Sequence, residues 1–472
     1  MVSTKQDFIK KYTRALWEGN AALFAGAGLS QPSGFVNWKE FIRPLATEIG
    51  LDVDQEHDYL SVAQYYRNRK GASVSVSQAI MDAFSKNAAT NDNIKILSRL
   101  PIFAYWTTNY DELLEKGIKE ANRNPDVKYE SDQLTVIKPG RDAIVYKMHG
   151  DVSNPAKAVL TKSDYELYAK ERPLFRTTLK SNLISKVFLF IGFSFEDPNI
   201  DYIFGQLHTL LADNVKEHFC FFRRVQESEC ANKKEYEYCL AKQDMREENL
   251  RKYGIQTIYV DSYNEITHIL LELEKAFKMH NVFISGSADE FVAPWDRVKT
   301  EKLAGQLAAT LVRNEYCVTS GFGLGIGSAV INGALDVIYK EKFSHVDKYL
   351  CLRPFPQNIV DPNERIARWK KYREDILGHT GVSIFMFGNK KDTTGNIIEA
   401  DGCVQEFEIA KEKGNLIIPI GSTGYAAKTI LGRVRADIAD YQYLLPYLDR
   451  LENEKNIDKI VELIIEIINT RG

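Results

Sequence analysis

The sequence lacks any uninterrupted apolar run of roughly 18 residues, the length that a membrane-spanning helix requires. Residues 1–11 are charged and amphipathic, without the apolar core of a secretory signal peptide. Neither sign of charge dominates, because 61 Lys and Arg residues balance 64 Asp and Glu residues to a net charge of -3. That balance gives no electrostatic reason to expect nucleic-acid or anionic-membrane partners. These absences predict a cytoplasmic protein with neither kind of partner.

Cysteine is also scarce, and its spacing argues against a metal module. The sequence has six cysteines, of which no two form a C-x-x-C pair, and most fall within apolar segments typical of strands or helices. We therefore expect buried thiols, no zinc module and no other bound metal. The cysteines are Cys220, Cys230, Cys239, Cys317, Cys351 and Cys403.

The chain has the composition of a globular protein, and 472 residues suffice for two or three domains. Apolar runs typical of strands alternate with segments of helical periodicity, which indicates an α/β fold with parallel sheets. We predict two Rossmann-like, doubly wound parallel-sheet units, residues 1–278 and 279–472. No Pro-, Gly- or Ser-rich linker separates them, so the junction is expected to be short and helical.

The strands expected in the first unit include 21–25, 103–107, 143–148 and 187–193. In the second unit they include 281–287, 316–320, 349–352, 382–387 and 416–420, the first of which runs into a small-residue turn. Helices are expected at 112–121 and 233–253 in the first unit, and at 297–313, 328–339 and 405–413 in the second.

Three short polar strings follow expected strands in the first third of the chain. They are Gly26–Ser30, Thr108–Asp111 and Lys147–Asp151. The carboxyl ends of parallel strands face one shared crevice, where ligands bind in open α/β sheets. A glycine turn, an Asn/Asp pair and a histidine are therefore predicted to converge on one ligand.

Each string also has an ordinary structural interpretation. The glycine turn has even odds of cradling a pyrophosphate or of simple packing, and Ser30 could bind phosphate or cap the following turn. Asn109 and Asp111 could cap a helix that begins near Glu112. A lone histidine is more often a structural group than a functional one, but the position of His149 opposite the other strings reverses that preference.

The three strings suit cleavage of the bond between nicotinamide and ribose in NAD. The leaving group is already activated as a pyridinium, so the reaction needs neither a general acid nor a metal. A site must hold the dinucleotide, exclude bulk water and position one nucleophile. Asn109 could orient the ribose or a water molecule, and His149 could accept a proton from either.

Together with Gly192–Ser194, these strings resemble the NAD-binding motifs of the sirtuin superfamily, in order and spacing. The resemblance covers roughly the first 275 residues and implies a catalytic role for Asn109, beside the nicotinamide ribose, and for His149, as the base. It implies that the remaining matched residues bind NAD: Gly26, Ala27, Gly28, Ser30, Asp111, Gly192 and Ser194.

The chain departs from the deacylating sirtuins in two respects. Their four-cysteine zinc module is missing, and helical segments 42–100 and 233–253 occupy the places where acyl-lysine-binding elements are expected. Simple hydrolysis of NAD is therefore favoured over an NAD-dependent protein deacylase or ADP-ribosyltransferase. A non-catalytic nucleotide sensor is the second alternative.

The second half resembles the SLOG family of Rossmann-like nucleotide sensors and processors, through Ser285–Ser287 and the glycine-rich stretch Gly321–Gly327. A flexible turn is the minority interpretation of that stretch. Residues 388–406 lack most of the loop found in nucleotide-cleaving members, so binding without catalysis is expected. Each charged residue alone is more often solvated surface. The predicted ligand-binding residues are Ser285, Gly286, Ser287, Gly323, Gly325, Arg353, Arg373, Lys390 and Glu406.

The combination of a zinc-free sirtuin-like half and a SLOG half resembles the effectors of the bacterial Thoeris anti-phage system. This resemblance implies a homotetrameric NADase. It also implies a partner TIR-domain enzyme that makes a cyclic ADP-ribose isomer on infection. Binding of that isomer to the SLOG half would switch on the sirtuin-like half, and NAD depletion would stop the infected cell.

Overall fold

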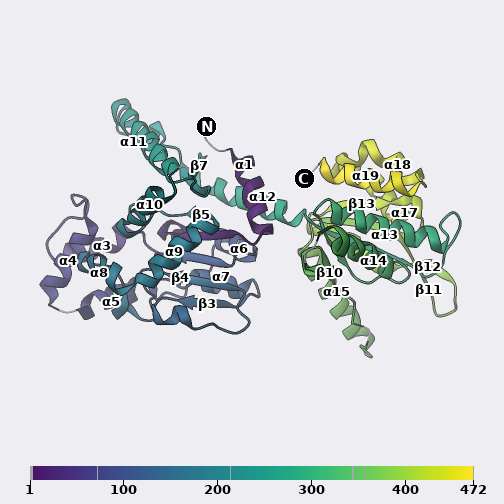
Figure 1. Cartoon of the computed structure of the whole chain (residues 1–472), viewed down its shortest axis with the longest axis horizontal. Coiled ribbons are helices and arrows are strands. Elements are labelled where there is room, and N and C mark those ends of the chain that lie inside the picture. Colours follow the sequence, from purple (N-terminus) through teal and green to yellow (C-terminus); the bar gives the residue numbers. More distant parts are fainter. Residues whose placement is uncertain (1–3, 72, 213, 343–344, 357, 471–472) are drawn as a thin grey trace. The chain divides into compact units, whose positions relative to one another are not determined.

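The computed structural model describes residues 4–71, 73–212, 214–342, 345–356 and 358–470. The chain divides into two compact units, Met1–Glu274 and Lys275–Gly472. The boundary falls inside one continuous helix, α12 (Tyr263–Lys278), and each unit has its own sheet (Figure 1). The two units are therefore described in turn.

In the described residues, the first unit is built on a seven-stranded sheet in the order β3-β4-β2-β1-β5-β6-β7. Every pairing in it is parallel, as predicted. Both β1 and β2 are buried along their whole length, which explains their continuous apolar sequences. The strands are β1 (Ala21–Ala25), β2 (Ala104–Thr107), β3 (Pro125–Lys128), β4 (Ala143–Lys147), β5 (Val187–Ile191), β6 (His218–Arg223) and β7 (Ile255–Val260).

The strand order reverses at β1, because the chain continues to β2 on one side and reaches β5 on the other. A doubly wound sheet has its ligand crevice at such a reversal. Helices α3, α4, α5 and α8 gather at one end of this unit (Figure 1). The helices are α1 (Lys5–Trp17), α2 (Ala27–Ser30), α3 (Trp38–Glu48), α4 (Tyr59–Lys70), α5 (Ser73–Phe84), α6 (Asp92–Arg99), α7 (Leu113–Glu120), α8 (Lys162–Glu171), α9 (Pro173–Ser185), α10 (Pro198–Leu211) and α11 (Lys233–Lys252).

The second unit has a mixed sheet in the order β10-β9-β8-β11-β12, with β13 also paired to β11. The α/β class is confirmed, but a purely parallel second sheet is wrong, because β12 runs antiparallel to β11. Asp392 accepts hydrogen bonds from the amides of Thr394 and Asn396, and this turn folds β11 and β12 into a hairpin. The strands are β8 (Asn281–Ala288), β9 (Cys317–Ser320), β10 (Leu350–Leu352), β11 (Val382–Lys391), β12 (Ile397–Glu399) and β13 (Leu416–Ile420).

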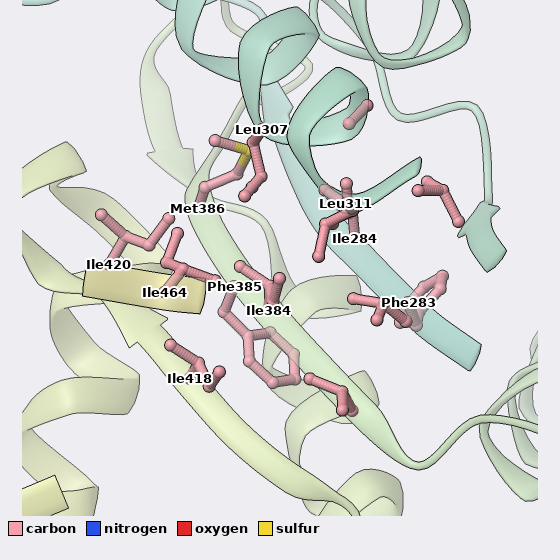
Figure 2. Close-up of a cluster of buried hydrophobic side chains, with 14 of the residues drawn as sticks. Phe283, Ile284, Leu307, Leu311, Ile384, Phe385, Met386, Ile418, Ile420 and Ile464 are labelled. Carbon is pink, nitrogen blue, oxygen red and sulfur yellow. The ribbon is translucent and has the colours of Figure 1, made fainter. Parts of the chain in front are cut away.

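The core of the second unit joins strands β8, β11 and β13 to helices on the sheet (Figure 2). Leu307 and Leu311 of α13 pack with Ile284 and Ile384, and Ile464 of α19 belongs to the same cluster. Ile464 and Ile384 are fully buried, as the periodic apolar positions of these segments require. The helices are α13 (Arg297–Arg313), α14 (Gly327–Val337), α15 (Pro362–Gly378), α16 (Asp401–Glu412), α17 (Tyr425–Ala436), α18 (Leu448–Asn453) and α19 (Ile457–Asn469).

Ser285–Ser287 lies in β8, within the strand expected over residues 281–287, and pairs with β11. The small residues serve close packing there, since a Cβ on Gly286 would lie 2.2 Å from the Met386 carbonyl oxygen. Two other local expectations in this unit are wrong. Lys390 lies within β11 rather than after it, because that strand continues to Lys391. Helix α16 begins at Asp401, so Glu406 lies in its second turn and not at its start.

Three of the six cysteine thiols are buried and three are not. Cys220, Cys317 and Cys403 are buried, and burial raises the pKa of each to about 12, whereas the other three are partly exposed. Buried thiols are thus observed at half of the expected positions. Within the described ranges, no helix combines the length and apolar character needed to cross a membrane.

Candidate active site

The carboxyl ends of β1, β2, β4 and β5 surround a cavity of about 740 Å³ in the first unit. That volume is typical of a site for a small molecule or cofactor. Gly26 contacts the cavity lining, because its carbonyl oxygen accepts a hydrogen bond from the Asn109 side chain at 3.1 Å. The other predicted NAD-site residues all line the cavity: Ala27, Gly28, Ser30, Asn109, Asp111, His149, Gly192 and Ser194.

The Asn109 amide is fixed by the loop that follows β1. Its Nδ2 donates to the Gly26 carbonyl oxygen and to the Ser30 hydroxyl, both at 3.1 Å. These contacts use both amide N–H groups, so the group left to meet a ligand is the side-chain oxygen. An oxygen held in this way can accept a hydrogen bond from a ribose hydroxyl or from water.

Asp111 performs the capping role that the sequence left open between two residues. Its Oδ1 accepts from the Leu113 amide at 3.0 Å, at the start of α7. The side chain is buried, and burial raises its pKa although the nearby charge of Lys147 opposes the shift. Asp111 therefore accepts from the first amide of α7, one residue before the N-cap Glu112, and also lines the cavity.

His149 is paired with a carboxylate that the sequence did not single out. Its Nε2 lies 3.0 Å from Asp197 Oδ2, and Tyr165 donates to the same oxygen at 3.0 Å. Asp197 also caps α10, because its Oδ1 accepts from the amides of Asn199 and Ile200. The carboxylate thus holds the imidazole, a phenol and a helix terminus together.

The charges around His149 favour an ionised carboxylate. Burial pushes the pKa of Asp197 upward, but the charge and hydrogen bond of His149 and the Tyr165 hydroxyl outweigh it, leaving the pKa below its ordinary value. Burial and the charge of Asp197 raise the pKa of Tyr165, which keeps its phenol a donor. A neutral imidazole that donates from Nε2 carries its lone pair on Nδ1, the atom then able to accept a proton.

The glycine turn after β1 interlocks with the turn after β5. The Gly26 amide donates to the Ile191 carbonyl oxygen and the Gly28 amide to the Gly192 carbonyl oxygen, both at 2.9 Å. A Cβ on Gly26 would lie 2.4 Å from that Gly192 oxygen. These two amides are committed within the protein, so close packing of the turns accounts for both glycines.

The cavity lining is rich in carboxylates, which favours a cationic group such as the pyridinium of NAD. Among its described residues the one Lys or Arg side chain is Lys39, whose Nζ is already paired with Asp54 at 2.7 Å. The carboxylates that line the cavity are Asp58, Asp111, Glu196 and Asp197.

Asp197 and Tyr165 are the residues that sequence reasoning missed. Asp197 precedes Pro198, the usual pairing at a helix start, which accounts for it without a second role. Tyr165 lies in α8, and its contact with Asp197 depends on how α8 and α10 pack. The one usable signal was the position of Asp197 just after β5, in the segment that also holds Gly192 and Ser194.

In the second unit, three of the predicted ligand residues form one buried cluster. The Ser285 hydroxyl donates to Glu406 Oε2 at 2.6 Å, and Arg373 Nε lies 3.4 Å from Glu406 Oε1. Arg373 is also stacked on Phe355, with its guanidinium carbon 4.9 Å from the ring centre. Burial raises the pKa of Glu406 despite these contacts with Ser285 and Arg373.

The remaining predicted residues of this unit lie around that cluster in different ways. Lys390 pairs with Asp401 on the surface, and the backbone of Arg353 bonds to Ser320. The Ser287 hydroxyl donates to the Asn389 carbonyl oxygen, and Gly323 packs on Gly286 of β8.

The unit also has a cavity of about 750 Å³ elsewhere on its surface. Of the predicted residues that the structure describes, only Gly325 lines this cavity. The cavity therefore does not mark the cluster formed by Ser285, Arg373 and Glu406. Among the residues described for both units, no group of His, Cys, Asp and Glu side chains is arranged to hold a metal ion.

Two family models match the chain. One, described as a SIR2-like domain, matches residues 104–258, and the other, described as a Sir2- and TIR-associating SLOG family, matches residues 265–471. The first match includes Asn109, His149 and Asp197, and the second includes Arg373 and Glu406.

Similarity to curated proteins extends over nearly the whole chain. A protein named NAD(+) hydrolase ThsA from Bacillus cereus (strain MSX-D12) is 42% identical over 468 residues, covering 98% of this chain and 97% of the relative. A protein of the same name from Acinetobacter baumannii (strain 532279) is 42% identical over 438 residues, covering 92% of this chain and 91% of the relative. Defense-associated sirtuin 2 from Bacillus subtilis is 26% identical over 232 residues, covering 48% of this chain and 22% of that protein.

Proposed function

Because the chain belongs to the ThsA family of NAD(+) hydrolases, we propose that its first unit cleaves NAD+ in the cavity lined by Asn109 and His149. The observation that carries this proposal is the pairing of His149 with Asp197 beside the fixed Asn109 amide, in one cavity of cofactor size. The chain is an NAD+ hydrolase, and the products are nicotinamide and ADP-ribose.

In the proposed reaction, the bond between the nicotinamide nitrogen and ribose C1′ breaks, and a water oxygen bonds to C1′. The electron pair of the broken bond stays on nicotinamide, which leaves as a neutral molecule. The Asn109 oxygen positions the ribose or the water, and the carboxylates of the cavity stabilise the positive charge that moves to the sugar. His149 accepts the proton that the water or a ribose hydroxyl loses, and Asp197 stabilises the resulting imidazolium.

We further propose that a cyclic ADP-ribose isomer binds the second unit and activates the first. The cluster of Ser285, Arg373 and Glu406 supports this role, because its buried acceptor and its stacked guanidinium suit a nucleotide with hydroxyl and phosphate groups. Such a ligand activates only if it binds the active arrangement more tightly than the resting one. No metal takes part in either step of this proposal.

The cellular setting is proposed on the same grounds. The protein acts in the cytoplasm as a homotetramer, and a TIR-domain enzyme supplies the cyclic nucleotide during phage infection. Depletion of NAD+ then halts the infected cell. The matching of residues 265–471 to a Sir2- and TIR-associating family supports the pairing with a TIR-domain protein.

The test is nicotinamide release by the full chain and by His149→Ala, each with and without cyclic ADP-ribose isomers, and without any acyl peptide. We expect release by the unsubstituted chain, stimulated by one isomer, and loss of at least about 100-fold in the variant. Release that requires an acyl peptide or a protein acceptor would instead identify a deacylase or a transferase. Unchanged NAD+ under every isomer would identify a sensor without catalytic activity.

A further inference from the structure

Lys147 is a fully buried lysine beside the candidate active site, and none of the steps above uses it. It is the last residue of β4 and lies opposite Thr107, the last residue of β2, in the parallel pairing. The loop with Asn109 therefore leaves the sheet beside Lys147, and the loop that begins directly after Lys147 carries His149 two residues further on. A buried ammonium at this junction requires partners from its surroundings.

Its partners belong to both loops. The Lys147 Nζ donates to the carbonyl oxygens of Tyr110 at 3.1 Å and Asp111 at 2.7 Å, which are the two residues after Asn109. It also binds the Asp151 carboxylate, two residues after His149, and lies 3.0 Å from Glu115 of α7. One side chain thus joins the two loops: it binds backbone carbonyl oxygens in the Asn109 loop and a side-chain carboxylate in the His149 loop.

The ammonium stays charged in this enclosure. Burial alone would lower the pKa of Lys147, but the carboxylates of Glu115 and Asp151 outweigh it, and the pKa is raised. The Asp151 carboxylate in turn accepts from the Ser153 amide at 2.8 Å, which fixes the turn beyond His149. A neutral side chain in this place would leave buried acceptors of both loops without their donor.

We propose that Lys147 is a positioning residue for NAD+ cleavage, which keeps the Asn109 side-chain oxygen and the His149 imidazole in fixed positions relative to each other. The inference rests on the proposed function, because it concerns the same cavity. Lys147 has no contact with the turns after β1 and β5 among its described hydrogen bonds and ion pairs, so its effect is on alignment of the reacting groups. Misplacement of such groups by about 1 Å costs roughly 100-fold in rate.

The chain offers a matched control in Lys128 of β3, the neighbouring strand. Lys128 is also buried, its Nζ donates to the Val136 carbonyl oxygen at 2.5 Å, and it pairs with Asp126 at 2.7 Å. Lys128→Met therefore removes a buried ammonium from the same sheet without touching either active-site loop. It reports the effect of lost stability alone.

The experiment compares Lys147→Met with Lys128→Met in the full chain. It measures nicotinamide release in the presence of the cyclic ADP-ribose isomer that stimulates the unsubstituted chain, NAD+ affinity by calorimetry in the His149→Ala background, and thermal unfolding. For Lys147→Met we expect kcat to fall about 100-fold while KM and NAD+ affinity change less than about threefold. Combined with His149→Ala, the substitution is expected to add much less than its own roughly 100-fold loss, because one of the two groups it aligns is already gone. Lys128→Met is expected to lower the unfolding temperature and keep kcat.

Asp151→Asn provides a second variant if Lys147→Met does not fold, since it keeps the ammonium and removes one partner. We expect it to lower kcat about tenfold with KM unchanged. The inference is overturned if the wild-type chain is active and the folded Lys147→Met or Asp151→Asn variant keeps its kcat, as Lys128→Met does. That result would leave the proposed function intact. A wild-type chain that cleaves no NAD+ with any cyclic ADP-ribose isomer would overturn both.

Discussion

At the scale of single residues, the proposed reaction depends on the contact between His149 and Asp197. The Nε2 of His149 faces the carboxylate at 3.0 Å, which fixes the orientation of the ring and leaves Nδ1 as the proton acceptor. Tyr165 donates to the same carboxylate, so the group that orients the ring is itself held in place. A substitution of Asp197 should therefore alter the tautomer and orientation of the His149 imidazole without disturbing the other residues that line the cavity.

Asp197→Asn tests this arrangement. Asparagine caps helices as well as aspartate, so α10 is expected to keep its start. Its amide donates toward His149 Nε2, however, and thereby moves the imidazole proton to Nδ1. We expect kcat for nicotinamide release to fall at least about 100-fold with little change in KM, because the wrong tautomer cannot accept a proton. Steady-state kinetics of the full chain measure both values.

The control is Asp201→Asn, which removes the same charge from the exposed first turn of α10. Its kcat should match that of the unsubstituted chain.

The pH dependence of the unfolding free energy tests the pairing of Asp197 with His149 independently. Because the folded pKa of Asp197 lies below its ordinary value, its stabilising effect is present above about pH 4 and lost on acidification through the folded pKa. Urea unfolding should show the gap between wild type and Asp197→Asn narrowing below about pH 4; a constant gap would contradict the pairing.

At this scale the sequence predicts residues that stand directly after strands. Asn109, Asp111 and His149 could be placed because strand ends meet at one edge of a parallel sheet. Asp197 and Tyr165 could not, because their contact depends on the packing of α8 and α10, which no local pattern encodes. Ser285 was expected in the strand over residues 281–287, but its hydrogen bond to Glu406 could not be predicted from that strand alone.

The element that shapes the cavity is the pair of interlocked turns after β1 and β5. Gly28 donates to the Gly192 carbonyl oxygen, and Gly192 has a φ of +63°. A Cβ on Gly192 would lie 2.2 Å from the Leu29 nitrogen, which is closer than any real contact. The glycines are therefore needed for the approach of two backbones, and only then for what the cavity binds.

Gly192→Ala is expected to separate these turns. The left-handed conformation alone costs about 1–2 kcal/mol for alanine, and the clash with backbone atoms adds to that cost. We expect the unfolding free energy to fall by more than about 2 kcal/mol and NAD+ affinity to weaken, since both turns line the cavity. Chemical denaturation and calorimetry with NAD+ provide the measurements.

Gly50→Ala is the matched control for that substitution. Gly50 also has a positive φ, of +84°, but a Cβ there would meet nothing within 4 Å among the described residues. This variant carries the conformational cost without the clash, and its NAD+ affinity should be unchanged. Equal losses in the two variants would show that the turns do not depend on close backbone approach.

The sequence predicted most strands of both sheets, because buried parallel strands are short apolar runs that end in small or polar residues. It missed β12 and the antiparallel hairpin, since residues 392–396 read as a loop whether or not strands flank them. Helices α8 and α10 were also missed, although α10 has the Asp197–Pro198 start that marks a helix. Elements of this kind are fixed by their neighbours more than by their own pattern.

At the scale of the whole molecule, the proposal requires that a ligand in one unit changes the reaction in the other. The proposed NAD+ site lies in the first unit, and the proposed activator cluster of Ser285, Arg373 and Glu406 lies in the second. Coupling between two sites is a free energy that is shared by both ligands. An activator that tightens NAD+ binding must therefore be bound more tightly in the presence of NAD+, by the same factor.

Arg373→Ala should weaken binding of the activator to the second unit. The guanidinium stacks on Phe355 and contacts Glu406, so its loss removes the positive group that would meet an activator phosphate. We expect the isomer concentration for half-maximal NAD+ cleavage to rise at least about tenfold, while the rate at saturating isomer stays close to that of the unsubstituted chain. Arg368→Ala is the control, because Arg368 lies on the same helix, is exposed and pairs with Glu364.

The inactive His149→Ala chain allows the linkage itself to be measured, because NAD+ is not consumed. Calorimetry should give one coupling factor, whether NAD+ is titrated with and without the isomer or the isomer with and without NAD+. Adding Arg373→Ala should weaken isomer binding in both titrations by the same factor and leave the affinity for NAD+ alone unchanged. Activation that persists at the same isomer concentration in Arg373→Ala would place the activator outside this cluster.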